Sequence, residues 1–300
     1  MFRHNRRLIL VLFFLLCLFL TMSFVSADDN ITDDGLEGAD CDDSLISLDQ
    51  SGGNNRVNSF KNLQNLINNS ISHEINIYKD YTYHEGDNPI IIDKSIVING
   101  NNHTLNALNK SSIFIIKSND VVIRNLNFLN AGCGEFNLST HGEDSFDAVI
   151  VDDFNIFKDY RNYLITDSTH HIGGAIYSAA NSLVISGCKF ENNHASLGGA
   201  IYSNCGNLFI DNVDFINNHA YCGAAIYLNA TNSTISNSRF LNNNASSFGS
   251  GIYQKKDNVK IINSTFLNNH AEDNSTLFLL DNWEFSGINL TYYNSFIVFK

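Results

Sequence analysis

Three sets of side chains in this sequence are of types that could do chemistry. Tyrosines and histidines each recur at intervals of 25 or 26 residues, and carboxylates with further histidines crowd the stretch near residues 131–172. The tyrosines are Tyr177, Tyr202, Tyr227 and Tyr253, and the histidines are His194, His219 and His270, with Asn244 between them. Exposed aromatic rings can stack on sugars or proteins, imidazoles can bind a metal ion, and clustered carboxylates can bind calcium or transfer protons. What each set can do depends on the elements that position it.

These elements are set by a unit of 25 or 26 residues that occurs four times between residues 173 and 274. Each copy opens with a glycine-led strand and closes with the pattern Phe-x-x-Asn-x-Ala. The opening glycines are Gly173, Gly198, Gly223 and Gly249, and the phenylalanines are Phe190, Phe215, Phe240 and Phe266. A fixed period of this size is typical of a stacked architecture in which every repeat packs on its neighbours.

Inside each copy, the apolar alternation of a strand slips by one residue at a glycine or an asparagine. These residues are Gly187, Asn212, Asn237 and Asn263. A strand loses its period of two only at a bend, and both residue types tolerate the left-handed backbone of a tight corner. A second asparagine column predicts another corner at Asn193, Asn218, Asn243 and Asn269. Three short strands and three turns per unit make one coil of a parallel β-helix, with the phenylalanine, isoleucine and alanine columns pointing inward.

The repeated motifs carry a family resemblance. Gly-Gly-Ala-Ile at 173–176 and 198–201, combined with the Phe-x-x-Asn pattern, resembles the repeat of chlamydial polymorphic outer-membrane proteins. It is even more similar to the adhesin-like surface proteins of methanogenic archaea. The resemblance covers about two-thirds of the chain. It implies a pectate-lyase-like, right-handed parallel β-helix, and it is specific for the fold and weak for any activity.

The rest of the chain divides into segments of different character. Residues 1–27 have the basic start, apolar run and small-residue end of a secretory signal peptide, and an uncleaved anchor helix is the alternative. Residues 28–56 are acidic and are predicted to form a disordered linker. At 57–72, apolar residues at helical spacing behind Ser59 predict a short helix that caps the first coil. The β-helix is predicted over 73–300.

The spacing between equivalent phenylalanines changes once. Phe128 and Phe190 are 62 residues apart, which predicts an insertion near 131–172 that loops out of one coil. Solenoids place insertions on one face, and such a face often carries binding. This insertion contains the carboxylates and further histidines, without a recognisable catalytic spacing.

The sequence favours binding over catalysis. Alternation places each tyrosine of the column outside its coil, so we expect an exposed aromatic stripe that binds glycans or proteins. Ladder packing beneath the inserted loop is the alternative for these tyrosines. The charged positions change identity from coil to coil and stack no carboxylate column, so no catalytic residue is assigned. The histidine column is interrupted by an asparagine and is expected to satisfy turns, so no metal ligand and no cofactor are assigned.

Composition limits the partners. The formal net charge of −13 argues against nucleic acid or an anionic membrane. Cys188 occupies an inward position and is expected in the core, whereas Cys205 and Cys222 are too far apart to bond, so the chain is not a disulfide scaffold. Eleven Asn-x-Ser/Thr motifs permit glycosylation, although a chain so rich in asparagine contains several by chance.

These observations predict a secreted or cell-surface, adhesin-like β-helix that binds an extracellular glycan or a surface protein through a repetitive face. A polysaccharide lyase or hydrolase of the pectate-lyase-like fold is one alternative, and an inert structural component of the envelope is another. Membrane contact is expected only through an uncleaved signal anchor. The strand edges of the C-terminal coil are otherwise unpaired, and three ways to cover them are open: the aromatic residues 292–299 fold over the end, another subunit covers it, or a downstream region of a longer chain does.

Overall fold

In the computed structural model, the described residues are 58–133, 172–204, 206–229, 231–255, 258–279, 283–291 and 296–299. The predicted signal segment 1–27, the predicted linker 28–56 and most of the predicted insertion near 131–172 lie outside them. Within the described ranges, no helix is both long and apolar enough to cross a membrane.

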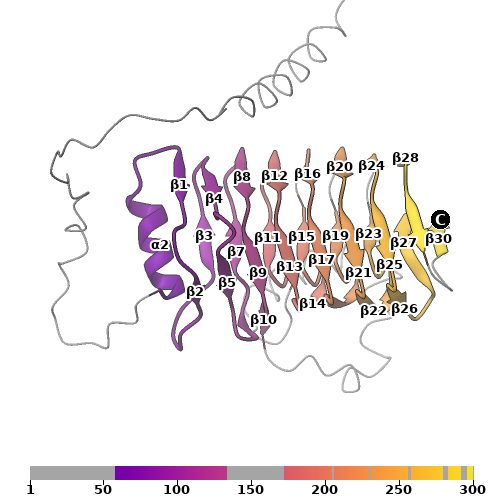
Figure 1. The fold of residues 1–300 in the computed structure, drawn as a ribbon, viewed down its shortest axis with the longest axis horizontal. Helices are drawn as coiled ribbons and strands as arrows, with labels where there is room; N and C mark the ends of the chain where they lie inside the picture. Colours follow the sequence, from indigo (N-terminus) through magenta and orange to yellow (C-terminus); the bar gives the residue numbers. More distant parts are fainter. Residues whose placement is uncertain are drawn as a thin grey trace, which may run out of the picture. The chain divides into compact units, whose positions relative to one another are not determined.

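The described chain winds as a parallel β-helix. Three sheets of eight strands each run along the stack, and successive coils contribute one strand to every sheet (Figure 1). The strand pairs within these sheets are parallel, and equivalent residues such as Ile176 and Ile201 face each other across neighbouring coils. The predicted fold class is therefore confirmed.

Each of the three sheets takes one short strand from every coil. The first sheet contains β1 (Glu74–Asn76), β4 (Val97–Asn99), β8 (Val121–Arg124), β12 (Leu183–Ser186), β16 (Phe209–Asp211), β20 (Ser233–Ser236), β24 (Val259–Ile262) and β28 (Trp283–Ser286). The second contains β2 (Tyr81–Thr82), β5 (Thr104–Asn106), β9 (Asn127–Leu129), β13 (Lys189–Glu191), β17 (Asp214–Ile216), β21 (Arg239–Leu241), β25 (Thr265–Leu267) and β29 (Asn289–Thr291). The third contains β3 (Ile90–Ile92), β7 (Phe114–Ile116), β11 (Ile176–Ser178), β15 (Ile201–Ser203), β19 (Ile226–Leu228), β23 (Ile252–Gln254), β27 (Ser275–Leu279) and β30 (Phe296–Phe299).

A fourth parallel sheet follows the second corner, where the sequence predicted a turn alone. Its strands are β14 (His194–Leu197), β18 (His219–Cys222), β22 (Asn244–Phe248) and β26 (His270–Ala271). These coils therefore have four strands instead of the predicted three. The chain continues past its buried alanine before it reverses at a glycine with positive φ, such as Gly198 (φ 66°). One further pair, β6 (Lys110–Ser111) with β10 (Gly132–Cys133), is antiparallel.

The register between coils follows the sequence repeat. Ile123 pairs with Ile185 and Phe128 with Phe190, so the coils on either side of the predicted insertion stack directly. The predicted left-handed corner residues are confirmed by their φ angles: Gly187 (59°), Asn212 (52°), Asn237 (50°) and Asn263 (45°). At the second corner, the left-handed residue is the first asparagine of each Asn-Asn pair, namely Asn192, Asn217, Asn242 and Asn268.

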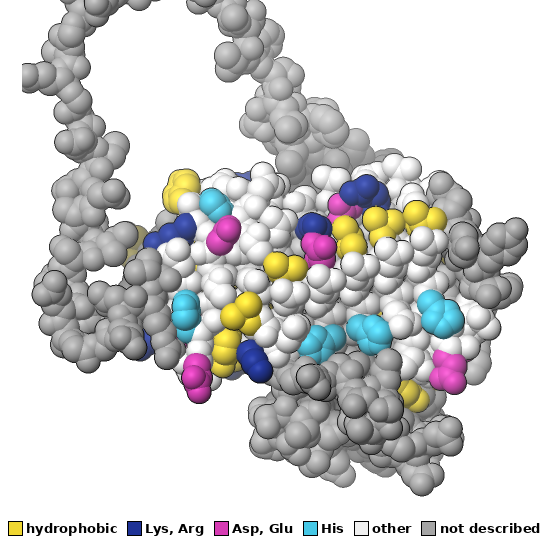
Figure 2. Space-filling view, turned by 60° about the horizontal axis from the view of Figure 1, so that its bottom comes forward, with side chains coloured by type: hydrophobic (Ala, Val, Ile, Leu, Met, Phe, Trp, Pro, Cys, Tyr) yellow, Lys and Arg dark blue, Asp and Glu magenta, His cyan; other side chains and the backbone are white. Residues whose placement is uncertain are grey.

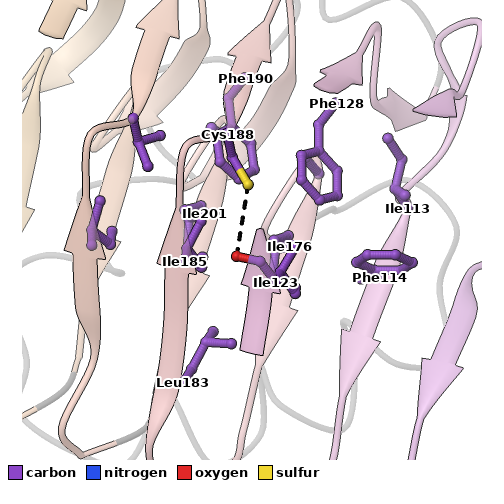
Figure 3. Packing of buried hydrophobic residues seen from close by; sticks show 14 of the residues in the cluster. Ile113, Phe114, Ile123, Phe128, Ile176, Leu183, Ile185, Cys188, Phe190 and Ile201 are labelled. Atoms are coloured by element: carbon purple, nitrogen blue, oxygen red, sulfur yellow. Dashed lines mark hydrogen bonds between the residues drawn. The ribbon is translucent and has the colours of Figure 1, made fainter. Parts of the chain in front are cut away.

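The phenylalanine column forms the centre of the core, as predicted. The five stacked rings are Phe128, Phe190, Phe215, Phe240 and Phe266, with centroids 4.4 to 5.2 Å apart and each residue fully buried. Figure 3 shows Phe128 and Phe190 on adjacent coils, with the Cys188 sulfur 3.8 Å from the carbonyl oxygen of Ile123. The predicted core position of Cys188 is confirmed by its burial.

The second asparagine of each Asn-Asn pair is buried and joins its neighbours in a hydrogen-bonded ladder. Asn193 Nδ2 donates to Asn218 Oδ1 (2.9 Å), Asn218 Nδ2 to Asn243 Oδ1 (3.0 Å), and Asn243 Nδ2 to Asn269 Oδ1 (2.9 Å). Each acceptor oxygen also receives the backbone N–H of the preceding coil's asparagine, as in Asn218 N to Asn243 Oδ1 (3.0 Å). The second Nδ2 proton goes to the carbonyl oxygen of a phenylalanine one coil earlier, as in Asn218 to Phe190 (3.0 Å). Buried amides are therefore satisfied without water.

The predicted N-terminal helix is present as α2 (Phe60–Asn69). Ser59 is its N-cap and forms a capping box with Asn62, and Phe60, Leu63 and Ile67 are buried. Gln64 pairs with the edge of the third sheet: its Nε2 donates to the Ile91 carbonyl (3.0 Å) and its Oε1 accepts from the Ile91 N–H (2.6 Å). The helix therefore covers the first coil and also satisfies two backbone groups at its edge, the N–H and the carbonyl of Ile91.

At the other end of the described stack, core positions become exposed. Trp283 pairs with Val259 in the first sheet, yet Trp283 is 46% exposed and Val259 only 2%. Phe285 is likewise half-buried, whereas its partner Ile261 is fully buried. Cover for this end by another subunit or a downstream region stays a prediction.

Replacing Phe215 with aspartate should unfold the middle coils. The substitution removes a fully buried ring, for which Phe→Ala changes cost about 3–5 kcal/mol, and it places a carboxylate among apolar side chains. We expect Phe215→Asp to lose the cooperative thermal transition of the parent, measured by circular dichroism. The neighbouring change Ile216→Asp, on the outer side of the same strand, is the control and should melt close to the parent. A parental melting curve for Phe215→Asp would contradict the inward assignment.

Asn218→Asp tests the amide ladder. The carboxylate keeps the acceptor oxygen but loses the protons that go to Phe190 and Asn243. Each buried group left unsatisfied costs about 1–3 kcal/mol, so we expect at least about 2 kcal/mol of destabilisation in urea unfolding. Asn217→Asp is the matched control, because Asn217 is exposed at the corner and aspartate tolerates its left-handed backbone. Equal stability of the two variants would refute a structural role for the ladder.

Candidate interaction face

The structure does not present the tyrosine column as an exposed stripe, which corrects the expectation from the sequence. Tyr202, Tyr227 and Tyr253 are only 6%, 3% and 9% exposed, and Tyr177 is half-buried. Their rings stack with centroids 4.8 to 5.7 Å apart, and Phe278 continues the column. These rings therefore form a second hydrophobic core and offer little surface to a glycan.

The fourth sheet is the reason for this burial. The tyrosines do point out of the third sheet, but Leu197, Cys222 and Phe248 at the ends of the fourth-sheet strands pack over them. The alternative from the sequence was ladder packing beneath the inserted loop. The tyrosines do pack as a ladder. Among the described residues, the side chains that cover this ladder belong to the repeats themselves. The sequence contains a signal for it, because an apolar residue precedes every opening glycine: Ile172, Leu197, Cys222 and Phe248.

The outer side of the second sheet carries a regular row of aliphatic side chains. Alternation along β9, β17, β21 and β25 turns Leu129, Ile216, Leu241 and Leu267 outward, and each is half-buried. Residues of adjacent coils in this row pair in register, with Glu191 between Leu129 and Ile216. We call these four residues the aliphatic row. Figure 2 shows hydrophobic side chains lined up along this side of the molecule.

A charged column lies beside the aliphatic row on the same strands. Its central members are Lys189, Asp214 and Arg239, which face one another on successive coils. Arg239 Nε donates to Asp214 Oδ1 (2.7 Å), and Lys189 pairs with Glu191. The hydrogen bond and charge of Asp214 raise the pKa of Arg239. Ion pairs this exposed contribute little stability, so the fold does not require these charges.

The histidine column lies on the fourth sheet, parallel to the aliphatic row (Figure 2). His194 faces His219, His219 faces Asn244, and Asn244 faces His270. Burial and, secondarily, the charge of His194 lower the pKa of His219, which favours its neutral form. Among the described residues, no three His, Cys, Asp or Glu side chains are placed to hold a metal ion together. The exposed corner asparagines Asn217 and Asn242 separate this column from the aliphatic row.

Together these rows make an extended, repetitive surface. It repeats with the spacing of stacked strands, about 4.8 Å, and combines aliphatic, amide and imidazole groups. The carboxylates and histidines of the predicted insertion lie outside the described residues. A repetitive face of a solenoid is a common location for extended binding surfaces.

Comparison with known families identifies the family to which the chain belongs. The model of the right-handed β-helix region matches residues 111–299, which is more than half of the chain. The protein therefore belongs to the right-handed β-helix family, in agreement with the handedness implied by the sequence resemblance. No curated protein and no solved structure matched in the corresponding comparisons.

The buried thiols and phenols predict that stability falls in alkali. Burial raises the pKa of Cys188 and Cys222 to about 12, and it raises the pKa of Tyr227 well above its usual value. In the unfolded chain these groups ionise near their ordinary pKa, about 8.5 for cysteine and about 10 for tyrosine. Because the folded values are raised, the stabilising contribution is complete below the unfolded pKa and is lost as the pH rises toward the folded pKa. Urea unfolding should therefore become easier as the pH rises from about 8.5 to about 12.

Tyr227→Phe is the control for the phenol part of this effect. Phenylalanine keeps the ring in the stacked column but has no proton to lose, so the variant should lose less stability above about pH 10 than the parent. A free energy of unfolding that does not change over this range would contradict the burial of these groups.

Proposed function

We propose that this chain is an adhesin-like protein of the cell surface or extracellular space that binds a surface partner through the aliphatic row. The observation that carries the proposal is the row itself: half-buried aliphatic residues that stand in register on the outside of a parallel sheet. Export rests on the predicted signal peptide at residues 1–27, and the adhesin-like role rests on the resemblance of the repeats.

The chemistry of the row favours a protein partner over a glycan. Sugars are bound through stacking on exposed aromatic rings, and three of the four tyrosines that could have supplied such rings are buried. Ile216, Leu241 and Leu267 offer instead a narrow apolar strip with the polar residues of the charged column on one side. Apolar strips with polar rims are typical of protein–protein contacts. A surface protein is therefore the first candidate, and a glycan the second.

The test removes the strip without touching the core. Ile216→Ser combined with Leu241→Ser shortens two outward side chains, and the fully buried Phe215 and Phe240 stay in place. Binding of the labelled, purified chain to intact cells or envelope material of its source should weaken at least about tenfold, which corresponds to about 1.4 kcal/mol. The melting temperature of the double variant should stay near that of the parent.

Val184→Ser combined with Phe209→Ser is the matched control. These residues point outward from the first sheet, and Phe209 is 41% exposed. This pair should leave binding unchanged. Equal binding by the parent and the Ile216/Leu241 double variant would refute the proposal. Release of unsaturated uronate products from acidic polysaccharides by the purified chain would favour the lyase alternative instead.

A further inference from the structure

Five Asn-x-Ser/Thr motifs place their asparagine at an exposed corner of a coil. All five asparagines have left-handed backbone: Asn102 (φ 63°), Asn109 (φ 58°), Asn232 (φ 57°), Asn263 (φ 45°) and Asn274 (φ 63°). At such a corner the side-chain amide stands clear of the sheets, and a large group attached to it would project into solvent. A corner of this kind is therefore compatible with attachment of an oligosaccharide.

The hydroxyl two residues later divides these motifs into two classes. An enzyme that glycosylates asparagine recognises this hydroxyl as well as the amide. Thr104, Thr234 and Thr265 point outward from their strands and are half-buried. Ser111 is 3% exposed and donates to the Ser112 carbonyl (2.7 Å), and Thr276 is fully buried. Only the first three motifs offer both groups on the folded surface.

We propose that Asn102, Asn232 and Asn263 are N-glycosylation sites of the folded protein, and that Asn109 and Asn274 are not. The sugar donor is a lipid-linked oligosaccharide. The asparagine Nδ2 loses a proton to a base of the transferase and forms a bond to C1 of the first sugar. The bond from C1 to the donor phosphate breaks, and the lipid phosphate leaves with its electron pair. The proposal rests on the proposed function for export, because such donors are used on the far side of a membrane.

The other Asn-x-Ser/Thr motifs among the described residues do not combine an exposed corner asparagine with an accessible hydroxyl. Asn68 lies within the helix α2 and not at a coil corner, and Asn229 and Asn244 are half-buried, unlike the exposed Asn102, Asn232 and Asn263. The motifs at Asn30 and Asn137 lie outside the described residues, and the side chain of Asn289 is not among the described ones.

The three sites make few contacts that glycosylation would disturb. Asn263 Nδ2 donates to Asn237 Oδ1 (2.8 Å) at an exposed corner, and Asn232 Oδ1 accepts from Asn258 Nδ2 (3.2 Å). Asn102 contributes its backbone carbonyl to Asn127 Nδ2 (2.7 Å), which leaves its side chain out of that bond. None of these three asparagines belongs to the buried amide ladder.

The positions also relate to the proposed interaction face. Thr104 and Thr265 occupy the same outward column of the second sheet, on either side of the coils that carry Lys189, Asp214 and Arg239. Oligosaccharides on Asn102 and Asn263 would therefore flank the central part of the aliphatic row without covering it.

The experiment compares transfer to the folded chain with transfer to unfolded peptides. Folded, unglycosylated full chain is incubated with a membrane oligosaccharyltransferase and a lipid-linked oligosaccharide, and occupancy is mapped by mass spectrometry of glycopeptides. We expect occupancy at Asn102, Asn232 and Asn263 at least tenfold above that at Asn109 and Asn274. Short peptides containing the same five motifs should all be modified. Modification of Asn109 or Asn274 as fast as Asn263 in the folded chain, or none at the three sites, would overturn the proposal.

A pair of variants isolates the hydroxyl. Thr265→Ala should abolish the oligosaccharide mass at Asn263, whereas Thr265→Ser should keep it, with both chains folded. Retained modification in Thr265→Ala would overturn the assignment of that site. Protein taken from its natural source should carry sugars on the three sites, and bare asparagines there would also overturn it. The adherence assay is to be run with chain that carries no sugar, so that its result and this one are independent.

Discussion

The register of the stacked coils is the constraint on which the rest of the structure depends, and the buried amide ladder is the interaction that enforces it. Asn193, Asn218 and Asn243 each use their side chain to bond the coil before and the coil after, and Asn269 bonds the coil before it. Aliphatic packing tolerates small slips between strands, but an unpaired buried amide does not. A shift of one coil by a single residue would break several of these bonds at once. The phenylalanine rings can stack face to face because the amides hold the coils in place.

Local backbone conformation explains why one glycine in each repeat is invariant and the next is not. Gly198 has φ 66°, and a Cβ there would lie 2.2 Å from the carbonyl oxygen of Ile201, so no other residue fits. The following position is Gly199, but its equivalents are Ala224 and Ser250. There the restriction is closeness to the next coil and not a left-handed backbone: a Cβ on Gly199 would lie 2.3 Å from the Ala224 carbonyl oxygen, whereas the later coils accommodate alanine or serine at the equivalent position. The reversal at the invariant glycine is what returns the chain over the tyrosine column and creates the second core.

The sequence alone predicted those features that depend on local residue patterns. The phenylalanine column and the left-handed corners follow from periodicity and from residue type, and the helix behind Ser59 follows from its cap. The fourth sheet was missed because its strands are only two to five residues long and rich in small residues, which leaves no alternation to detect. Alternation also says only which side of its own sheet a tyrosine occupies. Whether that side meets water depends on another segment, here the one that ends in Leu197 or Cys222.

The fold requires the columns inside the coils to repeat but not the columns outside, and this difference bears on the aliphatic row. Inside the coils, repetition is required, because each side chain must pack on its equivalent in the next coil. Outside, the fold imposes no such requirement, and the column of Lys189, Asp214 and Arg239 changes its charge at every step. Ile216, Leu241 and Leu267 nevertheless stay aliphatic on three successive coils, on the same strands as that variable column. Packing within the chain accounts for the inner columns but not for this outer one, since each of these three side chains stays partly exposed. The contact proposed above would account for it, and the charges alongside would be free to vary because they would lie at the margin of that contact.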